Sequence, residues 1–438
     1  MGKEVDDLIR NIGRNIAFET GIRVGLSLTA RLLLGYLGGL PATAISVNAA
    51  VAFFLSAVFE LPLGMAADIF SRTVSMRLGY FCQCLASLSI FCAVLIFPIW
   101  PIGMWILITA EGVLDALGNS LLSGAREAAY QSFIEGRLGA TPPDEQARIR
   151  KGYLSSAEAH GRAVLVFFPL FVIGAVLVLN AHGGHGHFAM LIIAAGWLAI
   201  DRQFRGWSKR EPRASGAKPT LTAWREEFLG SIRLLRQRGR ELWPPVACWM
   251  VNRFVYITVT CYFALAVIKD RTLWRSANPA LPALVFSVFL LGGRLARSFI
   301  LPAMAKTRAN ESIVLTGAAL QSVLAGALLI FPLRGGPIFV IFAAAVGGVF
   351  DVLAGLVERP ALGLILIAVP ERVRASFLSL ISAVVLLLQF AYSVRLTALG
   401  TGVPSMWEIW SLVLGGSLVM SLACLDWQAI PRRMALAK

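Results

Sequence analysis

Long apolar segments with few charges recur along the whole 438-residue chain. A helix needs about 20 apolar residues to cross the hydrocarbon core of a bilayer. The segments are too long for barrel strands and lack the alternating polarity of such strands. We therefore expect an all-α polytopic membrane protein. The sequence predicts twelve transmembrane helices, over residues 16–38, 44–66, 74–97, 101–123, 155–180, 187–205, 244–268, 280–304, 313–332, 337–359, 375–399 and 406–427.

Composition supports this class and excludes others. Hydrophobic residues make up 57% of the chain and charged residues 15%, against about 25% charged in soluble proteins. These values argue against a soluble, disordered or fibrous protein. The six cysteines lie in apolar stretches without a paired framework, which argues against a disulfide scaffold. Because no phosphate-binding loop, nucleophile elbow or zinc-protease motif is present, we expect neither an enzyme nor a cofactor.

The basic residues predict the orientation. The net charge is +15, and with both termini inside the cell the cytoplasmic segments hold 27 basic residues. The outer loops hold only Lys269, Arg271, Arg275 and Arg334. The positive-inside rule therefore predicts cytoplasmic N- and C-termini, in a cytoplasmic (inner) membrane whose anionic headgroups meet the basic segments. We expect no nucleic-acid partner, because the chain lacks a basic soluble module interleaved with aromatic residues.

A long cytoplasmic segment divides the predicted helices six and six. We expect an N-terminal six-helix bundle over 1–200, a linker over 201–243 and a C-terminal six-helix bundle over 244–438. The linker holds either a solvated basic stretch or an amphipathic helix at the inner membrane surface. The apolar stripe of that helix would comprise Trp224, Phe228, Ile232 and Leu235.

The two predicted bundles contain matching sequences. Glu111-Gly-Val-Leu-Asp115 in the fourth helix resembles Gly347-Gly-Val-Phe-Asp351 in the tenth, an offset of 236 residues between the aspartates. Residues 148–155 resemble residues 372–379, at an offset of 224. Because both matches come in the same order, they predict two bundles in parallel repeat, as in a large class of transporters.

A motif after the second predicted helix points to a family. Residues 64–72, Gly-Met-Ala-Ala-Asp-Ile-Phe-Ser-Arg, resemble the signature between helices 2 and 3 of the major facilitator superfamily, Gly-x-Leu-Ala-Asp-x-x-Gly-Arg-Arg/Lys. The preceding Glu60-Leu-Pro-Leu-Gly and the later Ser123-Gly-Ala-Arg-Glu are similar to one branch of that superfamily. The resemblance implies the superfamily fold, transport by alternating access, and a conformational latch. Its expected residues are Gly64, Asp68, Arg72 and Arg77.

The physical basis of the latch can be stated from the residues. Gly64 lets two helices approach closely. The carboxylate of Asp68 can face the N-terminus of a neighbouring helix and a nearby arginine. The alternative is an ordinary surface ion pair between Asp68 and Arg72.

Ionisable residues at membrane depth are costly and usually face a cavity or one another. In the superfamily, helices 1, 4, 7 and 10 line the central cavity. We therefore expect a proton and substrate cavity with several arginines, which favours an anionic or zwitterionic solute. The candidate residues are Arg23, Arg31, Glu111, Asp115, Glu158, His160, Arg162, Asn252, Arg253, Arg294, Arg297, Asp351 and Glu358.

Asp115 and Asp351 are the candidates for proton coupling, since burial disfavours the charged form of a carboxylate. The alternative for each is a static ion pair, such as Asp115 with Arg23. A cluster of His182, His185 and His187 in an outer loop is a weak metal candidate, and the alternative is a polar glycine-rich turn.

Together these observations predict a proton-coupled symporter or antiporter that moves a small organic solute as a monomer. An efflux pump for drugs, amphiphiles or siderophores is the alternative within the superfamily. A sensor or scaffold that kept the fold without transporting is the alternative outside it.

Overall fold

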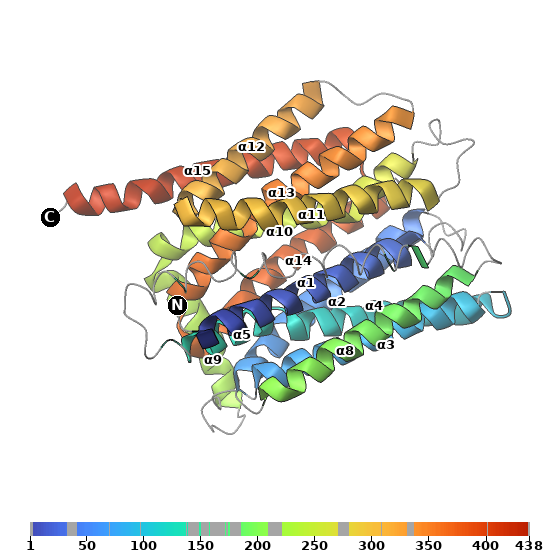
Figure 1. Ribbon diagram of the computed structural model, residues 1–438, viewed down its shortest axis with the longest axis horizontal. Helices are drawn as coiled ribbons and strands as arrows, with labels where there is room; N and C mark the ends of the chain where they lie inside the picture. The colour runs from blue at the N-terminus through green and yellow to red at the C-terminus, as the bar shows by residue number, and fades with distance from the viewer. Residues whose placement is uncertain are drawn as a thin grey trace.

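The computed structural model describes eleven long helices and four shorter ones, and no strand occurs in the part of the chain it describes (Figure 1). That part comprises residues 3–32, 42–69, 71–96, 98–136, 138, 149, 157, 171, 174–175, 185–208, 221–269, 280–307, 309–330, 337–400 and 402–436.

The N-terminal half is the set of elements that precede residue 209. They are α1 (Lys3–Leu32), α2 (Ala42–Ile69), α3 (Arg72–Ile96), α4 (Pro101–Leu122), α5 (Ala125–Glu135), η3 (His185–Phe188) and α8 (Ala189–Ser208). Pro101 begins α4 at a position where no backbone N–H donor is needed. Gly124 separates α4 from α5 with a φ of 68°, a left-handed conformation that glycine adopts without strain.

The C-terminal half follows the connecting helix α9 (Leu221–Gln237). Its elements are α10 (Gly239–Lys269), α11 (Ala280–Thr307), α12 (Asn310–Ile330), α13 (Pro337–Ala368), η5 (Glu371–Val373), α14 (Arg374–Ala398) and α15 (Met406–Leu436). Helix α9 lies where an amphipathic helix was predicted. On its predicted apolar stripe Phe228 and Leu235 are half-buried, whereas Ile232 is exposed.

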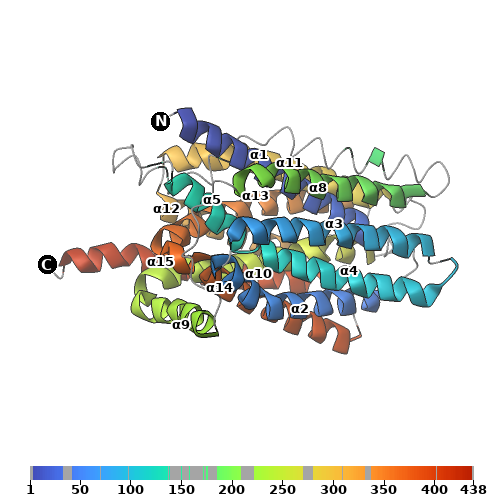
Figure 2. The ribbon, with the colours of Figure 1, turned by 90° about the horizontal axis from the view of Figure 1, so that it is seen from below.

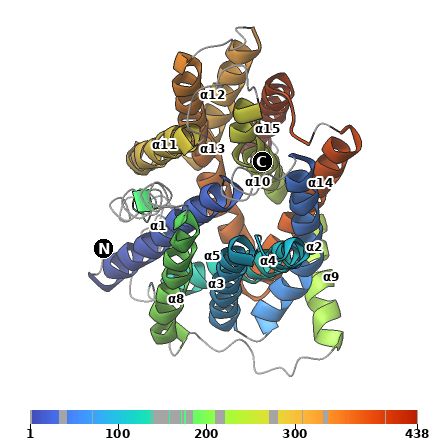
Figure 3. The same cartoon turned by 90° about the vertical axis from the view of Figure 1, so that its right-hand side faces the viewer.

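The two halves form two groups of helices (Figure 3). Seen along the helices, α3, α4, α5 and α8 gather on one side, and α11, α12, α13 and α15 gather on the other. Helix α2 packs along α14, and this pair is the most extensive contact between the halves. Helix α9 lies at one end of the molecule beside α14 and α2 (Figure 2).

Eleven of the twelve predicted spans coincide with described helices. The fifth, 155–180, lies almost wholly outside the described residues, so the count of twelve stays a prediction. The first helix begins earlier than predicted, at Lys3, because Val5, Ile9 and Ile12 form a buried stripe that continues the helix into the polar N-terminal segment. Helix α5 was not predicted.

Eight described helices are long and apolar enough to cross a membrane. Between 33% and 61% of each apolar stretch is buried inside the protein, so the rest of its surface faces outward. Large apolar side chains such as Phe81, Val323 and Leu422 are at least half exposed. Soluble monomers rarely expose continuous apolar surface on this scale, and a lipid environment accounts for it.

Candidate functional site

Asp68, at the end of α2, contacts the N-terminus of α14. Its Oδ2 accepts hydrogen bonds from the backbone N–H of Ser376 at 2.8 Å and from the Ser376 hydroxyl at 2.9 Å. The first N–H groups of a helix have no partner within the helix, and the helix dipole favours a negative charge there. Asp68 therefore caps a helix of the C-terminal half from the N-terminal half.

Arg72, the first residue of α3, extends this contact. Its Nε and one terminal nitrogen donate to Oδ1 of Asp68 at 3.0 and 2.7 Å. It also donates to the Ser132 hydroxyl at 2.6 Å and to the backbone carbonyl of Glu371. One guanidinium thus joins α2, α5 and the segment that leads into α14.

An ion pair also crosses between the halves at the same end. Arg374 donates to the carboxylate of Glu135 at 3.2 and 3.3 Å, and the Arg374 side chain is 4% exposed. We call the end of the bundle that holds Asp68, Arg72, Glu135 and Arg374 the latch end.

Gly64 lies one turn before Asp68 against α14. A Cβ at Gly64 would collide with the side chain of Ser379. The two helices can therefore pack closely only because the residue is glycine. Arg77, the remaining predicted latch residue, lies elsewhere: its Nε donates to Asp201 of α8 at 2.9 Å, within the N-terminal half.

In the N-terminal half, Glu19 on α1 is the centre of a charged cluster. Its carboxylate is 1% exposed and accepts hydrogen bonds from Arg23 at 2.9 Å, from Tyr80 at 3.2 Å and from Arg126. Arg126 also donates to Glu127 at 2.9 Å through Nε. Two arginines thus share two carboxylates, and Arg23 keeps 35% of its side chain exposed.

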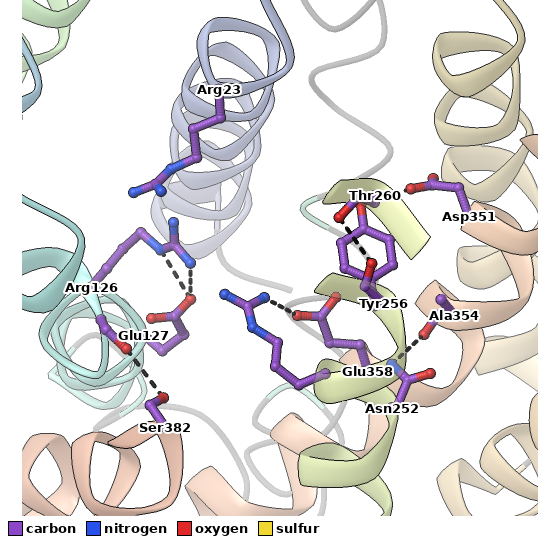
Figure 4. Close-up of polar contacts among 12 residues, drawn as sticks. Arg23, Arg126, Glu127, Asn252, Tyr256, Thr260, Asp351, Ala354, Glu358 and Ser382 are labelled. Atoms are coloured by element: carbon purple, nitrogen blue, oxygen red, sulfur yellow. Dashed lines mark hydrogen bonds and ion pairs between the residues drawn. The ribbon is translucent and has the colours of Figure 1, made fainter. Parts of the chain in front are cut away.

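A smaller charged pair lies opposite, in the C-terminal half. Arg253 on α10 donates to Glu358 on α13 at 2.9 Å. Arg253 is 41% exposed, and Glu358 interacts electrostatically with Arg126 of the other half. Figure 4 shows Arg23, Arg126 and Glu127 on one side and Glu358 on the other, with the Glu358 carboxylate pointing across. The two charged groups therefore face each other between the halves.

Asp351 lies deeper in the C-terminal half, among basic and phenolic groups. Tyr256 donates to its Oδ1 at 2.9 Å, and Arg294 donates to the Tyr256 oxygen at 2.7 Å. Nitrogens of Arg294 and Arg297 lie 3.6 and 3.8 Å from the Asp351 carboxylate. Asp351 is completely buried. Its surroundings, with two arginines beside one carboxylate, match the alternative prediction of a static ion pair.

Asp115 has different surroundings, although its sequence position matches that of Asp351. It accepts hydrogen bonds from the side-chain amides of Gln83 at 3.0 Å and Asn119 at 2.9 Å. The predicted pairing of Asp115 with Arg23 is not what the structure has: Arg23 binds Glu19 and the Asn119 oxygen. No arginine forms an ion pair with Asp115 among the described residues.

The other predicted residues lie apart from these clusters or outside the described part of the chain. Asn252 donates to the carbonyl of Ala354 at 3.1 Å, which ties α10 to α13 (Figure 4). Glu111 is half-buried on α4, one turn from Asp115. The side chain of Arg31 and the residues Glu158, His160, Arg162 and His182 lie outside the described residues, as does the side chain of His185.

His187 packs among aromatic side chains. It is 7% exposed, and its ring packs against Phe91 and Phe188 at centroid distances of 5.6 and 4.6 Å. The described residues contain no group of three or more side chains placed to hold a metal ion.

Comparison with known proteins identifies the fold. No family model matches the sequence, and no curated protein matches it. Solved structures do match: the proton:xylose symporter XylE has a TM-score of 0.63 at 14% identity, over 97% of this chain and 95% of that one. The E. coli fucose:proton symporter FucP has a TM-score of 0.59 at 12% identity, over 96% and 97%. The nucleoside transporter NupG has 0.56 at 13% identity, over 96% and 99%.

The fold is that of the major facilitator superfamily. These similarities cover nearly the whole chain, so the resemblance of the short motif extends to the complete architecture. The fold and the apolar helices make the chain a multi-pass membrane protein.

Sequence reasoning missed several residues of the site. Arg126 and Glu127 appeared in the sequence analysis only as part of a family motif and were not predicted as site residues. The predicted fourth helix ended before them, and α5 was not expected. Glu19 was not among the site residues, although it precedes Arg23 by four residues, a spacing that pairs charges on one helix face. Glu60 was treated only as part of the family motif.

Proposed function

We propose that the protein is a secondary active transporter that moves a small polar solute by alternating access, coupled to protons. The solute is anionic, or it is zwitterionic and carries one negative and one positive charge. The observation that carries this proposal is the pair of charged groups that face each other between the halves. Arg23 and Arg126 lie on the side of the N-terminal half, and the pair of Arg253 and Glu358 lies on the side of the C-terminal half.

The exposure of these side chains supports a binding role. Arg23 and Arg253 keep 35% and 41% of their side-chain surface exposed, while their carboxylate partners are largely buried. A carboxylate of the solute can therefore bind the exposed edge of a guanidinium without breaking the resident pair. A positively charged group of the solute would contact Glu358. Binding to both sides would draw the two halves together.

The latch end supports alternating access. The contacts of Asp68 with Ser376, and of Glu135 with Arg374, exist only while the two halves touch at this end. Rocking of the halves must break them and restore them in each cycle. They therefore bias the protein toward the conformation that is closed at the latch end.

The solved structures that share the fold support proton coupling. Two of them are described as proton symporters, for fucose and for xylose. Within this chain, Asp351 is paired with two arginines, Arg294 and Arg297. Asp115 is surrounded by amides, so of the two aspartates we propose Asp115 as the coupling residue.

The remaining features of the proposal concern the surroundings. We propose that the latch end faces the cytoplasm in a cytoplasmic (inner) membrane, that the basic residues of α9 bind anionic headgroups there, and that the protein acts as a monomer. Arg233 and Arg236 on α9 are exposed, as such binding requires.

The experiment uses purified protein in two stages. A thermal-shift screen against organic acids, amino acids, sugars and nucleosides finds a stabilising compound, and uptake of that compound into proteoliposomes is then measured. We expect an Arg253→Gln variant to lose binding. The matched control is Arg395→Gln, which removes an arginine from another Arg–Glu pair, with Glu408, in the same half. Equal binding by both variants would contradict the assignment.

A further inference from the structure

Glu60 on α2 is a carboxyl group sealed inside the contact between the halves. The residue is 1% exposed, and its Oε1 accepts no hydrogen bond from any described residue. The hydroxyls of Ser120 on α4, of Ser123 directly after α4 and of Ser382 on α14 lie close to the carboxyl. The group therefore lies where α2, α4 and α14 meet.

The surrounding hydroxyls cannot satisfy a charged carboxylate. The single proton of Ser120 is donated to the backbone carbonyl of Ser56 at 3.1 Å. Ser123 and Ser382 are hydrogen-bonded to each other at 3.3 Å, so one of their two protons is already used. At most one of the three hydroxyl protons remains for Glu60. An ionised carboxylate has about four acceptor sites, and a buried charge without donors is very costly.

The protonated form fits the same surroundings. A carboxylic acid carries its own donor, and serine oxygens have lone pairs that accept it. The charged group that acts on Glu60 is Arg253 of α10, whose charge is already balanced by Glu358 at 2.9 Å. Arginines on the other adjoining elements have partners of their own: Arg126 binds Glu19 and Glu127, Arg72 binds Asp68, and Arg374 binds Glu135.

Glu60 lies on the same helix face as the latch. Glu60, Gly64 and Asp68 are four residues apart on α2, and they contact Ser382, Ser379 and Ser376 of α14 in turn. The carboxyl of Glu60 is about 12 Å from the latch along the helix, at 1.5 Å per residue. When α14 separates from α2 at the latch end, Ser382 leaves Glu60 and water can reach it.

We propose that Glu60 is a second proton-binding site, distinct from Asp115, which holds a proton while the halves are closed at the latch end and releases it to water when α2 and α14 part. The proposal rests on the alternating-access function proposed above for the parting of the halves. Only an O–H bond is broken, and the acceptor is water. Proton binding at Glu60 then favours closure, and opening favours proton release, because the two equilibria are linked.

The test measures the protonated carboxyl directly, without any solute. The protein is placed in lipid nanodiscs, and infrared difference spectra are recorded as the pH is raised. We expect the wild type to show the C=O band of a buried carboxylic acid. Glu60→Gln should lose that band, and Glu60→Asp should keep it. Asp115→Asn is the matched control and should keep the Glu60 band as well. Asp115, the proposed coupling residue, gives a C=O band of its own when it is protonated, so the Glu60 band is the one that Glu60→Gln lacks and Asp115→Asn retains. Identical C=O bands in Glu60→Gln and in the wild type would overturn the proposal.

A second measurement tests the link to opening. Asp68→Asn weakens the latch, so the Glu60 band should disappear at a pH at which the wild type still shows it. An unchanged titration of the band in an opened Asp68→Asn protein would overturn the linkage. Since neither measurement uses a transported solute, failure here is distinguishable from failure of the transport proposal. If Arg253→Gln loses transport but keeps the Glu60 band, the result concerns the solute site alone and still supports the proton site at Glu60.

Discussion

Replacing Asp68 by asparagine should open the latch end. Asp68 uses one oxygen for Ser376 of α14 and the other for Arg72. Both sets of partners are donors. An asparagine has one oxygen and one NH2 group, so it can accept from only one of the two sets. If its oxygen faces Ser376, its NH2 group points at the guanidinium of Arg72; if it is turned around, the contact with α14 is lost.

The size of the effect follows from these bonds. Only the two bonds to Ser376 cross between the halves directly from Asp68. A hydrogen bond to a charged group contributes about 1.5–3 kcal/mol, and a neutral one about 1 kcal/mol. If the asparagine oxygen faces Ser376, two bonds to a charged group become two neutral bonds, which costs the closed conformation about 1–4 kcal/mol; if it is turned away, both bonds are lost, which costs about 3–6 kcal/mol. Because about 1.4 kcal/mol is a factor of ten, the ratio of closed to open protein should fall by about fivefold or more.

The assay measures the distance between the halves at the latch end. Spin labels are attached at Gly136 and Ala309, which are both exposed, after the native cysteines are replaced. The wild type should give a short distance, and Asp68→Asn should shift most of the population to a longer one. The control is Asp201→Asn, which breaks a carboxylate–arginine pair inside the N-terminal half. Unchanged distances in Asp68→Asn, or an equal shift in Asp201→Asn, would refute the reasoning.

Four further predictions concern the packing at Gly64, the two aspartates Asp115 and Asp351, and the orientation in the membrane. Gly64→Val should shift the label distance as Asp68→Asn does, because its side chain collides with Ser379; a closed variant would contradict the close packing. Asp115→Asn should lose pH-driven uptake of the compound found by thermal shift but keep its counterflow, measured in the same vesicles. Asp351→Asn should lower the free energy of unfolding by about 3 kcal/mol or more, since two buried arginines lose their counter-charge; an unchanged melting temperature would count against this. A reporter fused at Lys438 should be active only on the cytoplasmic side.

Much of the fold could be predicted from the sequence. A helix that crosses lipid must satisfy its own backbone and expose apolar side chains, and both requirements leave a clear pattern. The start of α1 could not be placed this way, because Lys3–Asn15 is polar in composition and is helical through packing of its narrow stripe against the bundle. Helix α5 was not predicted, because it is separated from α4 only by Gly124, whose positive φ turns the chain between the two helices.

The site was harder to predict, since it depends on partners distant in sequence. The motif indicated that Asp68 needs a helix N-terminus nearby, but nothing in it names Ser376, which lies 308 residues away. The repeat suggested equal roles for Asp115 and Asp351. The structure gives them different partners because the adjoining helices differ: α3 supplies the amide of Gln83, whereas α11 supplies two arginines.

A spacing pattern in the sequence underlies the contact between α2 and α14. Glu60, Gly64 and Asp68 repeat every four residues, and Ser376, Ser379 and Ser382 repeat every three. Each set therefore forms one helix face, and the two faces meet in antiparallel register along α2 and α14. Small residues in the middle of this contact allow close packing. The close packing excludes water from Glu60, and Asp68 holds the contact shut. Glu60, the close contact at Gly64 and the proposed latch at Asp68 thus lie on one line of contact between α2 and α14, so we expect a change at one of them to shift the other two.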